Sequence, residues 1–178
     1  MCGIVAASGK RNVIPILMDG LQRLEYRGYD SAGIAVLENN AITRIRKQGK
    51  VGELYKEIEK NKTLTSKNGI AHTRWATHGE PSIKNAHPHT SGDEFSNDEI
   101  ALVHNGIIEN FDTIRQQMTE KGYAFTSKTD SETIVHLIHC FRKKASLLEA
   151  IALASKELEG DFAIAIIDPK HPEKIFGT

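Results

Sequence analysis

The chain has 178 residues, 39% hydrophobic and 26% charged, a composition typical of one globular domain with a single core. Its 23 basic and 23 acidic residues balance, so net charge indicates neither nucleic acid nor membrane as a partner. Two cysteines without a CxxC motif argue against a disulfide scaffold and a structural zinc site. The apolar run after Met1 is too short for a signal peptide or membrane span, so we expect a cytoplasmic protein.

Apolar periodicity predicts the elements of the first half of the chain. A β-branched run after Cys2 indicates a buried strand, and helical spacing beyond Asn12 indicates a helix with Asn12 as its N-cap. Asn39-Asn40 indicates a hairpin turn. The expected elements are a strand at 3–7, a helix at 12–25, strands at 34–37 and 41–48, a helix at about 52–60 and a strand from 69. Eight basic against three acidic residues at 41–67 indicate a solvated helix face.

The second half is predicted to begin with a long loop. Residues 76–99 hold two prolines, two glycines and few apolar residues, and 90–99 is expected to be a solvated surface excursion. The elements expected after it are a strand at 100–104, helices at about 111–121, 131–144 and 146–158, a strand at 162–167 and a last strand from 175. Consecutive strands joined by tight turns, with helices in groups, predict an α+β fold with antiparallel strands covered by helices.

Cys2 is the first residue with the chemistry of a nucleophile. Removal of Met1 places a thiol and a free α-amine on one residue, the pairing that N-terminal nucleophile enzymes use. That amine has an unperturbed pKa of roughly 7.7–8.0, so much of it is a base near neutrality. The alternative is that Cys2 is an inert packing residue. The other cysteine, Cys140, is predicted to pack on a helix face.

The strand that ends near Arg74 leads into a group of side chains suited to binding. Arg74 offers a rigid charged fork for a substrate carboxylate. Thr77 and His78 add hydrogen-bonding groups, and Gly79 lets the backbone approach a ligand closely. The alternative is that Arg74 pairs with a surface acid while Trp75 fills the core. The position at the end of a buried strand favours a binding site.

Polar groups also stand at the ends of two later elements. Asn105-Gly106 is a common hairpin turn signal, yet a helical pattern follows it, so the amide and the glycine N–H can instead form an oxyanion hole. Thr129 or Asp130 caps the next helix, or the Asp130 carboxylate binds a substrate ammonium. His87-Pro88-His89 lacks supporting ligands, so we predict no metal site.

Together these motifs resemble the glutaminase domain of class II glutamine amidotransferases. The strings that carry the likeness are Cys2-Gly3-Ile4, Tyr26-Arg27-Gly28-Tyr29-Asp30-Ser31-Ala32-Gly33, His72-Thr73-Arg74-Trp75-Ala76-Thr77-His78-Gly79, His87-Pro88-His89 and His104-Asn105-Gly106. The second and third are similar to the glucosamine-6-phosphate synthases, also called glutamine–fructose-6-phosphate aminotransferases. The likeness covers essentially the whole chain, so residues 1–178 are expected to be one glutaminase domain.

The resemblance implies an N-terminal nucleophile hydrolase fold, a four-layer αββα sandwich with antiparallel sheets. It also implies that Cys2 is the nucleophile, that its α-amine is the base, and that Asn105 and the Gly106 N–H form the oxyanion hole. Arg74 would hold the glutamine α-carboxylate and Asp130 the α-ammonium. The residues implied to line the site are Trp75, Thr77, His78 and Gly79. No cofactor and no metal are implied.

The resemblance further implies a substrate, a product and a partner domain. L-glutamine would be hydrolysed through a γ-glutamyl thioester, and in a full-length homodimeric enzyme the ammonia would convert fructose 6-phosphate to glucosamine 6-phosphate in a C-terminal sugar isomerase domain. The chain stops at Thr178, before such a domain, so we expect it to give only glutamate and ammonia. Two alternatives stay open: a stand-alone N-terminal nucleophile amidase, and a non-catalytic binding or regulatory domain that retains Met1.

Overall fold

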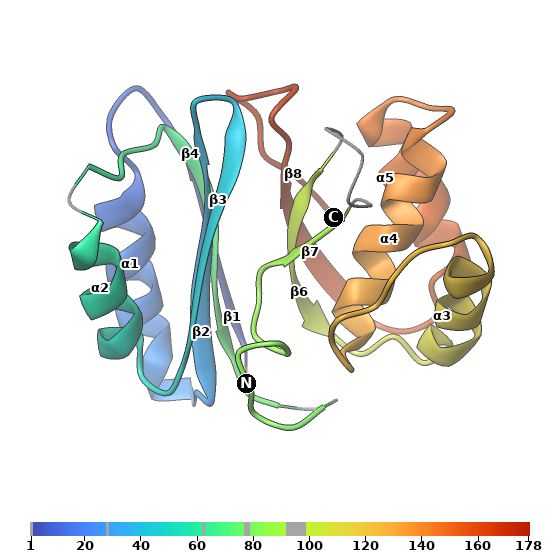
Figure 1. Ribbon diagram of the computed structural model, residues 1–178, viewed down its shortest axis with the longest axis horizontal. Helices are drawn as coiled ribbons and strands as arrows, with labels where there is room; N and C mark the ends of the chain where they lie inside the picture. Colours follow the sequence, from blue (N-terminus) through green and yellow to red (C-terminus); the bar gives the residue numbers. More distant parts are fainter. Residues whose placement is uncertain (1, 28, 62, 77–78, 92–98) are drawn as a thin grey trace.

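The structure is a computed structural model that describes every residue except 1, 28, 62, 77–78 and 92–98. In the described part, two four-stranded sheets lie face to face, and helices cover the outer face of each (Figure 1). The strand order is β1-β4-β2-β3 in the first sheet and β5-β6-β7-β8 in the second, and neighbouring strands are antiparallel. The predicted four-layer αββα sandwich is therefore confirmed.

The first sheet is built from the first half of the chain. Its elements are β1 (Gly3–Ser8), α1 (Ile14–Leu24), the short 3-10 helix η1 (Glu25–Arg27), β2 (Ser31–Glu38), β3 (Ala41–Gln48), α2 (Val51–Lys60) and β4 (Asn68–Arg74). Strands β2 and β4 are buried along almost their whole length because they lie between a helical layer and the second sheet. Asn39 and Asn40 have φ angles of 50° and 60°, as a type I′ turn requires, so the predicted hairpin is confirmed.

The second sheet and its helices follow. The elements are β5 (His89–Thr90), β6 (Ala101–Gly106), α3 (Phe111–Glu120), α4 (Asp130–Arg142), α5 (Leu147–Glu157), β7 (Phe162–Ile167) and β8 (Phe176–Gly177). Helix α4 is buried on nearly every side because it packs against β5, β6, α3 and α5. Helix α5 begins with a capping box in which Ser146 and Glu149 satisfy each other's backbone N–H groups. No helix in the described residues is long and apolar enough to cross a membrane.

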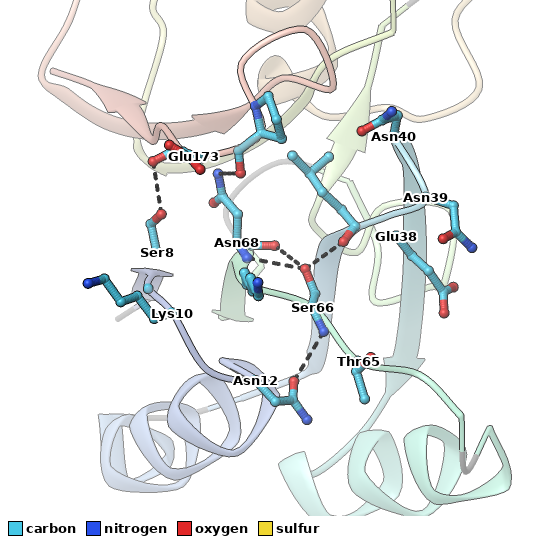
Figure 2. Close-up of a pocket in the computed structure, with 14 residues that line it drawn as sticks. Ser8, Lys10, Asn12, Glu38, Asn39, Asn40, Thr65, Ser66, Asn68 and Glu173 are labelled. Carbon is cyan, nitrogen blue, oxygen red and sulfur yellow. Dashed lines mark hydrogen bonds between the residues drawn. The ribbon is translucent and has the colours of Figure 1, made fainter.

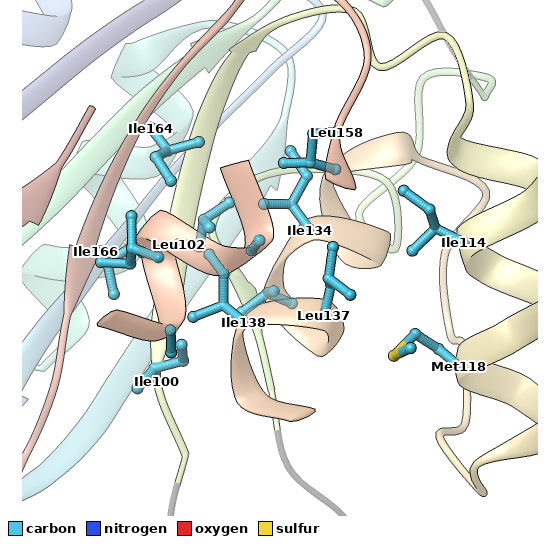
Figure 3. Packing of buried hydrophobic residues seen from close by; sticks show 14 of the residues in the cluster. Ile100, Leu102, Ile114, Met118, Ile134, Leu137, Ile138, Leu158, Ile164 and Ile166 are labelled. Carbon is cyan, nitrogen blue, oxygen red and sulfur yellow. The ribbon is translucent and has the colours of Figure 1, made fainter. Parts of the chain in front are cut away.

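Three apolar layers follow from this stacking. One lies between α1, α2 and the first sheet, one between the two sheets, and one between the second sheet and helices α3 to α5. Figure 3 shows part of the third layer, which includes Ile134 and Ile138 of α4 and Leu102 and Ile166 of the sheet. Cys140 packs against this layer, as the sequence predicts. The helices and sheets therefore bury their apolar faces against each other.

The layer between the sheets changes character along its length. On β4, Ile70 belongs to the apolar part, and His72 and Arg74 follow on the same face because a strand repeats every two residues. On β6, Val103 is likewise apolar and is followed by Asn105. One end of the gap is therefore apolar and the other is polar. The polar end holds the candidate active site.

The opposite end of the sandwich has a cavity of about 840 Å³ between the β2–β3 turn, the start of β4 and the chain near Glu173 (Figure 2). Its polar groups tie the two halves of the fold together. Asn68 Nδ2 donates to the carbonyls of Pro172 and Lys174 at 3.0 and 2.7 Å, and Ser8 Oγ donates to the Glu173 carbonyl at 3.0 Å. These side chains therefore link the first sheet to the 172–174 turn by hydrogen bonds.

Two predictions about local structure are wrong. Helix α1 has Val13, not Asn12, at its N-cap position, because the Asn12 side chain accepts hydrogen bonds from the N–H groups of both Ile14 and Ser66. The long loop predicted at 76–99 is interrupted, because His89–Thr90 forms β5 and most of 85–91 is buried. Most of the predicted excursion at 90–99 lies outside the described residues.

The basic stretch at 41–67 also differs from the prediction of a solvated helix face. Arg44 and Arg46 lie on β3, where Arg44 Nη1 donates to the Pro88 carbonyl at 3.3 Å and Arg46 Nη1 to the Ala86 carbonyl at 2.9 Å. Burial and the neighbouring Arg44 charge lower the pKa of Arg46 to about 10. These two arginines therefore hold the 84–88 segment against the edge of the first sheet.

A buried ion pair supports a test of the fold. The Arg142 guanidinium of α4 donates to both oxygens of Asp168 at 2.8 and 2.9 Å, and Asp168 follows β7 with no exposed surface. Burial alone would raise the pKa of Asp168, but hydrogen bonds from His171, the Lys170 N–H and Arg142 lower it overall. This carboxylate therefore contributes stability above its unfolded pKa of roughly 3.9, and that stability is lost as pH falls through the folded pKa.

We expect Asp168→Ala to reduce the free energy of unfolding at pH 7 by about 3–5 kcal/mol, because it removes one partner of a buried ion pair. Urea unfolding followed by circular dichroism measures this change. The matched control is Asp161→Ala, since Asp161 is an exposed carboxylate at the other end of β7, and it should change stability by less than about 0.5 kcal/mol. Equal stabilities for the two variants would contradict the role assigned to the pair.

Candidate active site

Strand pairing brings the predicted nucleophile, Cys2, and the residue predicted to bind the substrate carboxylate, Arg74, to the same end of the first sheet. Gly3 of β1 pairs with Thr73 of β4, so Cys2 falls beside Arg74. Ser31 of β2 pairs with Arg74 from the other side, which places Asp30 at the same edge. The register therefore gathers residues that are more than 70 positions apart along the chain.

Cys2 is held against the backbone of Trp75. The Trp75 N–H donates to Cys2 Sγ at 3.2 Å, and the thiol donates to the Trp75 carbonyl at 3.4 Å. Partial burial raises the pKa of Cys2, and the Asp30 charge raises it further, while the Trp75 N–H and Arg74 oppose this rise. The thiol is therefore protonated near neutrality and needs a base before it can attack. The Trp75 side chain is 53% exposed, so the alternative that it fills the core is wrong.

Asn105 and Gly106 lie at the end of β6, next to Cys2. Asn105 Nδ2 donates to the Cys2 carbonyl at 3.4 Å. Strand β6 pairs with β5 and β7, and the chain continues from Ile107 toward α3, so the simple hairpin alternative is wrong. Gly106 has φ 132°, and a Cβ there would lie 2.1 Å from the Asp161 carbonyl oxygen, so only glycine fits. The Asn105 amide therefore lies beside the backbone of Cys2, and the Gly106 N–H is the next one along the chain.

Arg74 is buried, with only 3% of its surface exposed, so the alternative of a surface ion pair is wrong. Its Nη2 donates to the Gly79 carbonyl at 2.9 Å, and its Nη1 lies 3.5 Å from Asp30 Oδ1. The Asp30 carboxylate also accepts hydrogen bonds from the Ala76 N–H and the Ser31 hydroxyl. Asp30 therefore organises the chain on both sides of Trp75. Thr77 and His78, which the sequence also places here, lie outside the described residues.

Asp30 is not among the site residues predicted from the sequence, although its contacts place it beside Arg74. The signal that marks it in the sequence is its place in the Arg-Gly-Tyr-Asp-Ser-Ala-Gly string. The structure also shows why residue 33 of that string is a glycine. A Cβ at Gly33 would lie 2.1 Å from the His87 carbonyl oxygen, so the 84–88 segment reaches β2 only because this side chain is absent. Two residues of this motif, Asp30 and Gly33, therefore contribute directly to the structure around Arg74 and the 84–88 segment.

Asp130 is the first residue of α4 and is buried. Its Oδ2 accepts the Ile108 N–H at 3.1 Å, and its Oδ1 lies 3.4 Å from the Ser131 hydroxyl. Thr129 occupies the N-cap position but makes no capping bond, because its hydroxyl is engaged with His89 Nε2 at 3.0 Å. Neither residue is the side-chain cap that was one of the predictions. The Asp130 carboxylate instead holds the segment that follows Gly106, where the helix dipole also favours a negative charge.

Four buried histidines, His72, His87, His89 and His104, lie close to one another beside the candidate site, between β4 and the start of α4. The rings of His72 and His87 are 4.1 Å apart, and those of His87 and His89 are 4.8 Å apart. The Ser131 hydroxyl joins His87 Nε2 at 2.7 Å and His104 Nδ1 at 2.8 Å. Burial lowers the pKa of His72 to about 3 and lowers the pKa of His87 and His89 well below the usual value. These three imidazoles are therefore neutral at working pH. No His, Cys, Asp or Glu group in the described residues has metal-binding geometry.

Comparison with solved structures assigns the chain to the class of N-terminal nucleophile hydrolase folds. Glutamine phosphoribosylpyrophosphate amidotransferase from B. subtilis aligns with a TM-score of 0.76 and 29% identity over 94% of this chain and 35% of that chain. A glutamine aminotransferase class-II domain protein from Silicibacter pomeroyi has the same fold, with a TM-score of 0.59 and 15% identity over 95% of this chain and 73% of that chain. The predicted N-terminal nucleophile hydrolase fold is confirmed by these alignments.

The sequence places the chain in a family within this class. The model of the glutamine amidotransferase domain family matches residues 72–177, and the chain belongs to that family. It is 51% identical to the isomerizing glutamine–fructose-6-phosphate aminotransferase of Vibrio vulnificus strain YJ016 and 50% identical to that of Legionella pneumophila strain Paris. Both matches cover 98% of this chain but 28% of the relative, so the chain spans just over a quarter of their length. The resemblance inferred from the motifs is confirmed.

The charge of Asp30 gives a test of the electrostatics at the thiol. Asp30 raises the pKa of Cys2, so Asp30→Asn should lower that pKa and increase the thiolate fraction below it, while the amide oxygen still accepts the Ala76 N–H. We expect iodoacetamide to alkylate Cys2 roughly 2- to 5-fold faster at pH 8 in a Cys140→Ser background. Asp19→Asn, which removes an exposed carboxylate on α1, is the control. A slower or unchanged rate in Asp30→Asn would contradict this account.

Proposed function

We propose that the domain is a glutaminase in which Cys2 attacks the side-chain amide of L-glutamine. The observation that carries the proposal is the contact between the Cys2 backbone and the Asn105 amide at 3.4 Å, in a chain of the glutamine amidotransferase family. A nucleophile and a hydrogen-bond donor for the developing oxyanion are the two parts that acyl transfer requires. Here the two are adjacent although 103 positions separate them.

The proposed chemistry begins with removal of Met1, which frees the α-amine of Cys2. The amine takes the thiol proton through a water, and the thiolate forms a bond to the amide carbon of glutamine. Asn105 Nδ2 and the Gly106 N–H stabilise the negative oxygen of the tetrahedral intermediate. The protonated amine then gives its proton to the leaving nitrogen, the C–N bond breaks, and ammonia leaves. Water then attacks the resulting γ-glutamyl thioester, the C–S bond breaks, the Cys2 sulfur takes up a proton, and glutamate leaves.

Arg74 and Asp130 are proposed to recognise the amino-acid end of the substrate. The Arg74 guanidinium now donates to the neutral carbonyl of Gly79, and a glutamine α-carboxylate is a stronger, charged acceptor for the same fork. The Asp130 carboxylate is buried and offers a negative partner for the α-ammonium. Trp75, Thr77, His78 and Gly79 are the remaining proposed lining residues.

The longer relatives support a proposal for the whole protein. Their name states that they are glutamine–fructose-6-phosphate aminotransferases. We infer that this domain supplies ammonia to a C-terminal sugar isomerase domain of a cytoplasmic homodimer, where fructose 6-phosphate becomes glucosamine 6-phosphate. By itself the domain gives only glutamate and ammonia, because the acceptor site belongs to the other domain.

The nucleophile is tested by Cys2→Ala. We expect this variant to lose glutamine-dependent ammonia release, since no thioester can form without the thiol, whereas Cys140→Ser keeps the wild-type rate. A coupled glutamate dehydrogenase assay measures the ammonia, and intact mass shows whether Met1 is absent. Wild-type protein without Met1 that releases no ammonia would contradict the glutaminase proposal. Retained Met1 together with no activity would favour the non-catalytic alternative.

The substrate is tested by Arg74→Ala. The loss of a charge-assisted contact to the α-carboxylate should raise KM and lower kcat/KM by roughly 10- to 100-fold. Arg74→Lys should fall between this variant and wild type, because lysine keeps the charge without the planar fork. Arg11→Ala, at an exposed arginine outside the site, serves as control. Unchanged glutamine turnover in Arg74→Ala would instead favour an amidase for a different amide.

A further inference from the structure

His72 contacts the proposed oxyanion hole from the side away from Cys2. It lies on β4 with no exposed surface, and its Nε2 is 2.9 Å from Asn105 Oδ1. Across the same amide group, Asn105 Nδ2 faces the Cys2 carbonyl at 3.4 Å. The Asn105 side chain is therefore held between one histidine and the backbone of the nucleophilic residue.

This arrangement fixes the direction of the Asn105 amide. If the amide were turned over, its oxygen would face the carbonyl oxygen of Cys2, and two acceptors would oppose each other. In the observed orientation the oxygen accepts from an imidazole N–H and the nitrogen points toward Cys2. A primary amide nitrogen carries two hydrogens, so one remains for an oxyanion after the Cys2 carbonyl has been satisfied.

The imidazole is suited to this task because it is neutral and held in place. Burial lowers the pKa of His72 to about 3, although the Asn105 hydrogen bond opposes that shift. The ring of His87 packs against it at 4.1 Å, and Gly33 of β2 pairs with His72 of β4. Since the facing atom of Asn105 is an acceptor, the single proton of the neutral ring lies on Nε2.

We infer that His72 is a positioning residue, whose Nε2–H orients the Asn105 amide as an oxyanion donor. This inference rests on the proposed glutaminase function for its catalytic consequence. His72 touches no reacting atom and acts through Asn105. Its loss should therefore affect the transition state, where the oxyanion develops, and leave the binding of glutamine almost unchanged.

The kinetic test compares His72→Leu, which removes the donor, with His72→Gln, which keeps an N–H at similar reach. We expect kcat for glutamine hydrolysis to fall roughly 10- to 100-fold in His72→Leu with KM within about 2-fold, and to recover substantially in His72→Gln. A wild-type kcat in His72→Leu, or equal losses in both variants, would overturn the inference.

A double-mutant cycle separates positioning from general damage to the fold. In an Asn105→Ala background, His72→Leu should reduce kcat no further, because the group that it orients is already gone. His89→Leu is the matched control, since His89 is a buried histidine of the same cluster that bonds Thr129. The fold-change in kcat caused by His89→Leu should be the same in the wild-type and Asn105→Ala backgrounds. Independent, multiplicative effects of His72→Leu and Asn105→Ala would refute the positioning role.

A measurement without substrate decides the inference even if the glutaminase proposal fails. In ¹⁵N-labelled protein, long-range ¹H–¹⁵N spectra should show a neutral His72 ring protonated on Nε2. The Asn105 side-chain amide signal, assigned by its loss in Asn105→Ala, should shift in His72→Leu and stay in place in His89→Leu. A ring protonated on Nδ1, or an Asn105 signal that does not respond to His72→Leu, would overturn the inference whatever the activity.

Discussion

The pairing of β1 with β4 is the constraint on which the site depends. Its register sets Gly3 opposite Thr73, and this brings Cys2 onto the backbone of Trp75. A shift by one residue would turn every side chain of β1 to the other face and separate the thiol from that N–H. The register is itself secured by burial, because β4 lies in the middle of the first sheet with both faces covered. The stability of the sandwich and the position of the proposed nucleophile therefore have the same origin.

Burying the polar groups beside the candidate site is costly, and hydrogen bonds offset part of that cost. Burial lowers the pKa of His72, His87 and His89, so these rings stay neutral. Ser131, Thr129 and Asn105 each bond one nitrogen of the rings that they contact. Buried Arg74 is balanced by Asp30. The bonds that fix the Asn105 amide leave it few alternative arrangements, which is the property that a preorganised oxyanion hole needs.

Much of the fold was predictable because each element carries its own local signal. The hairpin at Asn39-Asn40, the helices and the alternation of sheet and helix all follow from periodicity and turn chemistry. The errors arose where a distant partner decides the outcome. Asn12 is displaced from the cap because it also binds Ser66, and residues 85–91 are buried because Arg44 and Arg46 hold the neighbouring carbonyls.

The same reasoning explains what was seen and what was missed at the site. Cys2, Arg74, Asn105 and Asp130 are suggested by chemical type, position and the resemblance to a family. The roles of Asp30 and His72 depend on contacts across 44 and 33 positions of the chain, so no local pattern reveals them. Both residues belong to the motifs that carry the family resemblance, but only the folded structure shows which of their atoms make the contacts.

The electrostatics of Cys2 contain an opposition that bears on how such a site is used. Asp30 holds Arg74 in place, yet the same charge raises the pKa of the thiol. Without substrate the proposed nucleophile is therefore kept as a thiol, which is the less reactive form. An incoming carboxylate that bound Arg74 would add a second negative charge nearby and raise the pKa of the thiol further. Attack then has to depend on a base next to the thiol, and the α-amine of Cys2 is the base whose unperturbed pKa, roughly 7.7–8.0, suits that task near neutrality.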